Sequence, residues 1–223
     1  MSSIERLISV IAPHYCVVCG AAGNLLCINC RAGAFPPLPE RCYRCRVLSE
    51  GCKTCNKCRK VSPLGRVWVG AEYDGAAQAL IGRLKFGRAG AAADVTAARL
   101  AKVMPELVPE TIIVAVPTAS SRVRQRGYDQ AELIARTLAQ GTGAKYGKLL
   151  IRRGQSRQVG SKGAIRIKQL EHAFVPCRPK IIAGSHIILV DDVLTTGATI
   201  EAASRTLKSA GAKTVDAAVF AQA

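Results

Sequence analysis

Hydrophobic residues gather along the chain in short continuous runs and in longer stripes of helical spacing. IIVAVP at residues 112–117 and IILV at 187–190 are fully apolar, which predicts two buried parallel strands. Residues 149–152 and 215–220 are two further predicted strands. Apolar residues three and four positions apart predict helices at residues 74–84, 91–103, 129–139 and 198–209.

Alternating strands and helices imply an α/β fold, in which helices cover both faces of a parallel sheet. The segment SPLGRV at residues 62–67 has the proline and glycine expected of a connection. We therefore predict a small cysteine-rich head at residues 1–66 and a larger domain at residues 67–223. Residues 153–169 have no clear period, which indicates a loop or a weak helix.

The N-terminal sequence MSSIERLISVIAPHY combines an acid and a base with an apolar pattern. It predicts a short amphipathic helix better than it predicts a signal peptide or a membrane span. We expect a cytoplasmic protein without a membrane span.

Basic residues exceed acidic ones by a wide margin. The formal net charge is +17, from 32 lysines and arginines against 15 aspartates and glutamates. Residues 1–68 hold 10 basic and 3 acidic residues, and residues 122–168 hold 12 basic and 2 acidic ones. A local surplus of this size favours polyanionic partners or anionic small molecules.

Nine of the ten cysteines lie between Cys16 and Cys58, in the segments CVVC, CINC, CYRC and CKTCNKC. Two cysteines separated by two residues can bind one tetrahedral zinc ion, and disulfides are rare in a reducing compartment. The simplest grouping predicts two structural zinc sites, formed by Cys16, Cys19, Cys27 and Cys30 and by Cys42, Cys45, Cys55 and Cys58.

Other groupings of the cysteines stay open. Cys16 and Cys19 could share a zinc ion with Cys42 and Cys45, and Cys52 could replace a member of the second set. The zinc ions are expected to supply folding energy, because so short a segment can bury little core. A basic zinc ribbon serves as a scaffold or binds nucleic acid, and the sequence leaves both roles open.

Two adjacent acids, Asp191 and Asp192, follow the apolar run IILV and precede the turn LTTGAT. In an open α/β sheet, ligands bind at the carboxyl ends of the strands. The turn opens a helix, so its backbone N–H groups and threonine hydroxyls predict an anion site. The acids would repel a phosphate but suit sugar hydroxyls or a magnesium ion. A ribose 5-phosphate meets both requirements.

The segment IILVDDVLTTG resembles the phosphoribosyl diphosphate signature of type I phosphoribosyltransferases. The wider pattern includes YDGAAQALIGRLKFG, VPTASSRVRQRGYDQAELIARTL and SRQVGSKGAIRIKQLEHAF. With these segments the chain resembles the ComF family of competence-associated proteins, in which cysteine knuckles precede a domain of that fold.

The resemblance implies a role for particular residues. Asp191 and Asp192 would hold the ribose hydroxyls, and the 5-phosphate would lie against Thr195, Thr196, Gly197, Ala198 and Thr199. Thr118 and the residues up to Arg122 would face the diphosphate. Lys85 and the arginines Arg122, Arg124 and Arg126 are cations that could close over it.

Two functions fit these expectations. In the first, which the ComF resemblance favours, the protein binds phosphoribosyl diphosphate with magnesium and grips single-stranded DNA during uptake, together with other DNA-uptake proteins. In the second, the protein is a catalytic phosphoribosyltransferase that acts on an unidentified base or amine. Tyr73 and Phe86 are candidates to stack such a base, and core packing explains them equally well.

Overall fold

A five-stranded parallel sheet forms the centre of the computed structural model, which describes residues 14–86, 89–153 and 173–223. The strand order is β1-β7-β6-β2-β3, and every neighbouring pair is parallel. The strands are β1 (Val67–Glu72), β2 (Ile112–Ala115), β3 (Lys145–Tyr146), β6 (His186–Leu194) and β7 (Thr214–Gln222).

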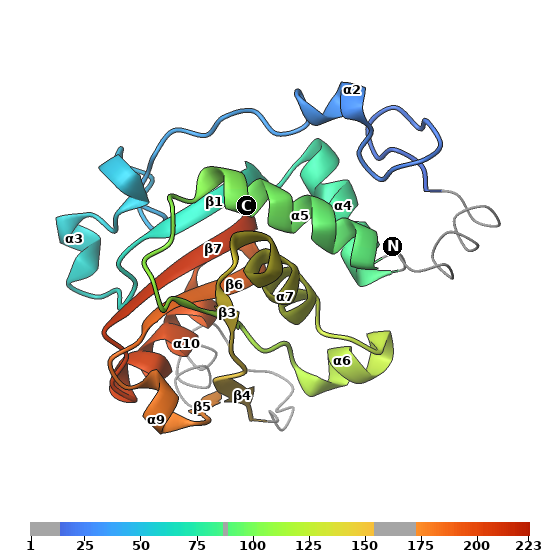
Figure 1. Cartoon of the computed structure of the whole chain (residues 1–223). Helices are drawn as coiled ribbons and strands as arrows, with labels where there is room; N and C mark the ends of the chain where they lie inside the picture. The colour runs from blue at the N-terminus through green and yellow to red at the C-terminus, as the bar shows by residue number, and fades with distance from the viewer. Residues whose placement is uncertain (1–13, 87–88, 154–172) are drawn as a thin grey trace, which may run out of the picture.

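Helices cover both faces of this sheet, as the continuous apolar runs predict (Figure 1). One face packs against α4 (Gly75–Lys85), α5 (Ala89–Val103) and α7 (Gln130–Thr142) through Ile113, Ile188 and Phe220. The other face packs against α10 (Ala198–Ser209) through the alternate positions of the same strands, among them Val114 and Leu189. The expected α/β fold with a covered parallel sheet is therefore confirmed.

The order in which the chain adds strands to the sheet reverses between β2 and β6, and this place is called the reversal point. The connection after β2 leads through α6 (Ser120–Arg126) and α7 to β3, whereas the connection after β6 leads through α10 to β7 on the opposite side. The two strands are direct neighbours, with Ala115 beside Val190. Their following loops therefore diverge from one point, where open α/β sheets form their ligand crevice.

The cysteine-rich region divides into two parts that join different layers of the fold. Around α2 (Ile28–Arg31), residues such as Leu26 and Phe35 pack with the α4, α5 and α7 layer. Around η1 (Glu50–Cys52) and α3 (Asn56–Arg59), Tyr43 and Leu64 pack with the α10 layer. Figure 1 shows the connecting segment, residues 32–41, passing over the β1 side of the sheet.

This connecting segment, residues 32–41, is held to the sheet by Arg99 of α5. The Arg99 guanidinium donates to the Gly70 carbonyl of β1 at 2.7 Å and to the Pro36 carbonyl at 3.2 Å. A cavity of about 590 Å³ lies beneath the segment, and Trp68 is one of its lining residues. None of the residues predicted to bind ribose phosphate lines this cavity.

Several elements differ in extent from the sequence-based expectation. The strand expected at 187–190 is longer, because β6 pairs with β7 as far as Leu194. The segment expected to be a diphosphate-facing loop forms α6 from Ser120 onward. β4 (Leu150–Arg152), expected as a strand, pairs with β5 (Phe174–Pro176), and the short helix α9 (Pro179–Ile182) follows.

Two expectations fall on parts of the chain that the structure leaves undescribed. The predicted N-terminal amphipathic helix lies mostly within residues 1–13, and the predicted loop or weak helix at 153–169 lies almost entirely within residues 154–172. Among the described residues, no helix is long and apolar enough to cross a membrane.

Candidate functional site

The acid pair lies in the carboxyl-terminal part of β6, at the reversal point. Both side chains are half-buried. The Asp192 N–H donates to Oδ1 of Asp191 at 2.9 Å, and the Val193 N–H donates to Oδ1 of Asp192 at 2.8 Å. These two hydrogen bonds use only Oδ1 of each carboxylate. The other oxygen, Oδ2, can accept from a ligand hydroxyl.

The surroundings of Asp191 oppose its ionisation. Burial raises its pKa well above the ordinary value of 3.8, and the charges of Asp192 and Asp129 raise it further. The Asp192 N–H acts in the opposite direction. A cation or a set of hydroxyl donors beside Asp191 would stabilise its ionised form, so the site favours such a ligand.

The turn between β6 and α10 contains Thr195–Thr199, the predicted phosphate-binding segment, which is called the phosphate loop from here on. Gly197 is the N-cap of α10 and has φ +79°, a left-handed conformation that glycine adopts readily. Thr195 and Thr196 are exposed, and the Thr196 hydroxyl accepts from the Ala198 N–H at 3.4 Å. The loop thus leads into the N-terminus of a 12-residue helix, whose unpaired N–H groups and dipole favour an anion.

The loop after β2 is fixed by Asp129. Its carboxylate accepts the Thr118 N–H at 2.8 Å and the Thr118 hydroxyl at 2.9 Å, and it also caps α7 by accepting from Ala131 and Glu132. Thr118 therefore lies in the expected loop, but its N–H and its hydroxyl proton are used within the protein. Arg122, by contrast, is exposed on α6.

Arg152 is a site residue that sequence reasoning missed. It extends from the end of β4 and donates to the Pro117 carbonyl at 3.4 Å. Burial lowers its pKa and so does Arg122, while Asp191 and Asp129 act in the opposite direction. The two arginines and two carboxylates therefore influence one another across the site. The sequence indicated the strand that contains Arg152 but carried no signal that this strand ends at the loop after β2.

Lys85 lies at the C-terminal end of α4, beside the segment that joins α6 to α7. The Tyr128 hydroxyl of that segment donates to the Leu84 carbonyl at 2.9 Å, and the Arg126 guanidinium lies 5.7 Å from the centre of the Phe86 ring. Phe86 is 78% exposed. An exposed aromatic ring and several cations thus lie together at this end of α4. Tyr73, the other candidate for stacking a base, packs against the core.

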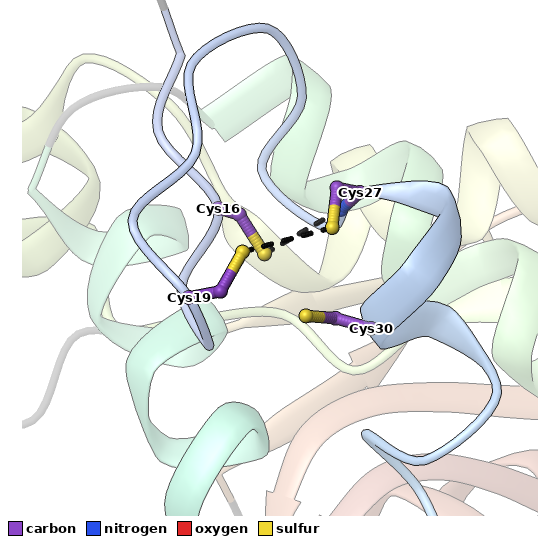
Figure 2. A group of neighbouring side chains, drawn as sticks. All are labelled: Cys16, Cys19, Cys27 and Cys30. Carbon is purple, nitrogen blue, oxygen red and sulfur yellow. Dashed lines mark hydrogen bonds between the residues drawn. The ribbon is translucent and has the colours of Figure 1, made fainter.

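The cysteines form two groups in the structure. Cys16, Cys19, Cys27 and Cys30 are the first tetrad, shown in Figure 2, and Cys42, Cys45, Cys55 and Cys58 are the second. Within each tetrad the four sulfur atoms lie within 4.8 Å of one another. The structure thus groups neighbouring pairs rather than interleaving them, and Cys52 belongs to neither tetrad.

The thiols of each tetrad fit a tetrahedral divalent metal. Backbone N–H groups of Cys27 and Cys19 lower the pKa of Cys16 to about 6. In the second tetrad burial opposes ionisation of Cys42, but N–H groups of Cys45 and Cys55 lower its pKa to about 6. Contacts with the other thiols raise the pKa of Cys30 to about 12. One thiolate forms easily, and the next needs a cation, which four-sulfur zinc sites supply.

The comparisons with known proteins agree with this geometry. The profile of the phosphoribosyl transferase domain matches residues 97–223, which include the acid pair, the phosphate loop and α6. The fold and the site therefore define a phosphoribosyltransferase-type domain.

Curated proteins are similar to much of this chain. The DNA utilization protein YhgH of Salmonella typhimurium (strain LT2) is 30% identical over 216 residues, which are 90% of this chain and 86% of the relative. That of Salmonella typhi is 31% identical over 173 residues, 72% of this chain and 74% of the relative. The competence protein ComFC of Bacillus subtilis is 32% identical over 100 residues, 45% of this chain and 39% of the relative. This chain belongs to the ComF family.

Proposed function

We propose that the protein binds phosphoribosyl diphosphate together with Mg²⁺ and assists the handling of single-stranded DNA in natural transformation. The observation that supports this most is the acid pair of β6, followed directly by the helix N-terminus of α10, at the reversal point of a parallel sheet. The family membership and the names of the relatives, which refer to DNA utilization and competence, support the cellular role.

Each part of the ligand has a matching group in the site. Asp191 and Asp192 accept the ribose hydroxyls, and the amides and hydroxyls of the phosphate loop bind the 5-phosphate. The diphosphate faces Arg122 and Arg152 across from the acid pair, and Lys85 is a further cation for it. Mg²⁺ enters with the diphosphate and supplies charge neutralisation there.

The two cysteine tetrads hold structural zinc in this proposal. Four thiolates satisfy the coordination of one ion, so no position is left open for a substrate. Each filled tetrad carries a formal charge of −2, which lowers the formal +17 of the chain to about +13. The protein therefore keeps a large positive charge for an anionic partner.

The surface around α6 has the groups that binding of single-stranded DNA requires. Arg122 and Arg124 are exposed on this helix, and Arg126 lies over the exposed ring of Phe86. Proteins that bind single strands combine cations that follow the phosphates with aromatic rings on which bases stack. The α6 arginines and Phe86 provide both groups in one place.

Fluorescence anisotropy with labelled oligo-thymidine tests this DNA interface. We expect the logarithm of the affinity to fall with the logarithm of the salt concentration, and the slope to flatten by about 0.7 in Arg124→Ala. The matched control is Lys180→Ala, an exposed cation on α9, which should keep the wild-type slope. A wild-type affinity that does not depend on salt would exclude this function.

Catalytic phosphoribosyl transfer is a second candidate, favoured by the cationic groups around Asp191. A transferase must stabilise the departing diphosphate, and we assign this task to Arg152 and Arg122, whose charges influence each other and Asp191. The assay is release of diphosphate from phosphoribosyl diphosphate with a panel of nucleobases and amines. Diphosphate release that requires one particular acceptor supports catalysis. If no acceptor causes diphosphate release, ligand binding without catalysis is the role.

A further inference from the structure

The second tetrad contacts the helix that carries the phosphate loop. Between Cys42 and Cys45 lie Tyr43 and Arg44, and both reach Glu201 in the first turn of α10. The Tyr43 hydroxyl donates to Oε1 of Glu201 at 2.6 Å, and the Arg44 guanidinium donates to the same oxygen. Tyr43 is 5% exposed and Glu201 is 6% exposed, so this contact is shielded from water.

Tyr43 also packs directly against the phosphate loop. A Cβ atom placed on Gly197 would lie 3.1 Å from Cε2 of the Tyr43 ring, closer than an ordinary van der Waals contact. The Glu201 N–H donates to the Gly197 carbonyl at 3.0 Å, which begins the helical hydrogen bonding of α10. The ring and hydroxyl of one tyrosine therefore contact both ends of the first turn of α10.

The segment Cys42–Cys45, which contains Tyr43 and Arg44, is anchored to the sheet as well as to α10. The Gln222 side chain, at the end of β7, donates to the Tyr43 carbonyl at 2.9 Å. The Tyr43 hydroxyl also contacts the Ser62 hydroxyl at 2.6 Å, and that oxygen accepts from the Leu64 N–H at 3.1 Å. Tyr43 thus has a fixed position that depends on the fold of the second tetrad.

Glu201 needs such partners if the phosphate loop is to bind an anion. A carboxylate in the first turn of a helix can itself accept from the free N–H groups there, and it repels a phosphate nearby. Tyr43 and Arg44 engage Oε1 of Glu201, and Arg205 lies 3.6 Å from Oε2. These contacts hold the carboxylate in place and compensate its charge.

We propose that Tyr43 and Arg44, fixed between two cysteines of the second tetrad, position the phosphate loop by holding Glu201, so that zinc occupancy of this tetrad sets the affinity for ribose phosphate. The inference rests on the proposed binding of phosphoribosyl diphosphate. It assigns no such role to the first tetrad, which packs with the α4, α5 and α7 layer.

Isothermal titration of zinc-loaded protein with phosphoribosyl diphosphate and Mg²⁺ tests this role. Tyr43→Phe keeps the ring but loses the hydroxyl that donates to Glu201, and we expect about tenfold weaker binding, the size of one hydrogen bond to a charged group. The matched control is Tyr146→Phe, because Tyr146 is a half-buried tyrosine on the edge strand β3. Equal affinity of wild type and Tyr43→Phe would overturn the proposal.

A pair of cysteine variants tests the dependence on zinc. Cys45 and Cys19 are exposed thiols in corresponding positions of the two tetrads. We expect Cys45→Ser to weaken binding by about tenfold or more, like Tyr43→Phe, and Cys19→Ser to weaken it much less. Equal losses in both variants would show a general effect of metal loss and would contradict the proposal.

Hydrogen exchange separates this inference from the proposed function, because it requires no ligand. We expect faster amide exchange at residues 195–201 in Tyr43→Phe than in wild type, and no change in Tyr146→Phe. If wild-type protein does not bind phosphoribosyl diphosphate, the proposed function fails, whereas unchanged exchange in Tyr43→Phe overturns the positioning role.

Discussion

Asp129 holds Thr118 by two hydrogen bonds, at 2.8 Å to the backbone N–H and 2.9 Å to the hydroxyl. The same carboxylate caps α7. The loop after β2 and the start of α7 are therefore joined through one side chain. Since this loop faces the acid pair across the reversal point, the shape of the proposed ligand site depends on Asp129.

Replacing Asp129 should destabilise the protein measurably. Asp129→Ala removes the cap of α7 and both bonds to Thr118, so we expect a loss of about 2 kcal/mol in the free energy of unfolding. Asp74→Ala is the control, because Asp74 is the N-cap of α4 but makes no capping bond through its side chain. Fluorescence of the single, buried Trp68 reports unfolding in urea. Equal losses in both variants would contradict this account.

Replacing Gly197 by alanine should cost more stability than the same replacement at an ordinary helix end. Gly143, the C-cap of α7, has φ +71° and open space around its Cα, so Gly143→Ala should cost about 1 kcal/mol from backbone strain alone. Gly197→Ala adds a contact with the Tyr43 ring to the same strain. We expect a larger loss of stability and weaker ligand binding in a side-by-side titration. Wild-type affinity in Gly197→Ala would argue against a phosphate at this loop.

The raised pKa of Asp191 predicts how stability depends on pH. Folding holds the Asp191 proton more tightly than the unfolded chain does, so this group favours the folded state at low pH. That contribution is lost as the pH rises from about 3.8, the ordinary aspartate value, through the higher folded-state pKa. Asparagine does not titrate, so the free energy of unfolding of Asp191→Asn minus that of wild type should increase as the pH rises. Urea titrations at several pH values would show a constant difference if Asp191 ionised normally.

Metal content should follow the grouping of the sulfur atoms. We expect two zinc ions per chain in wild type and one in either Cys19→Ser or Cys45→Ser. Cys52→Ser and Cys177→Ser are matched controls that should keep both ions, because these cysteines belong to neither tetrad. Elemental analysis of purified protein provides the measurement. Loss of an ion in Cys52→Ser would contradict the grouping.

The sheet and its main helices were predictable because their apolar residues follow clear periods. IIVAVP and IILV both form buried strands, and the stripe at 198–209 forms α10. Helix α6 was not predictable in this way, because SSRVRQR offers one apolar residue and therefore no period. Strand β3 has only two residues, too few for a pattern.

The position of the acid pair in the last part of a strand, directly before a turn into a helix, was predictable because these residues are contiguous in sequence. Contacts between distant segments were not. Arg152 approaches the loop that contains Pro117, and Tyr43 reaches Glu201 from 158 positions away. Neither pair has a local signature, since tertiary packing alone brings them together. The sequence therefore predicts a ligand, but it does not predict the residues from other segments that contact the candidate site.

The most direct test of the central claim is a crystal structure of the zinc-loaded protein with phosphoribosyl diphosphate and Mg²⁺. We expect the 5-phosphate against the amides of Thr195–Thr199 and the ribose hydroxyls within hydrogen-bond distance of Asp191 and Asp192. A ligand bound elsewhere, or an acid pair without contact to the ribose, would contradict the account.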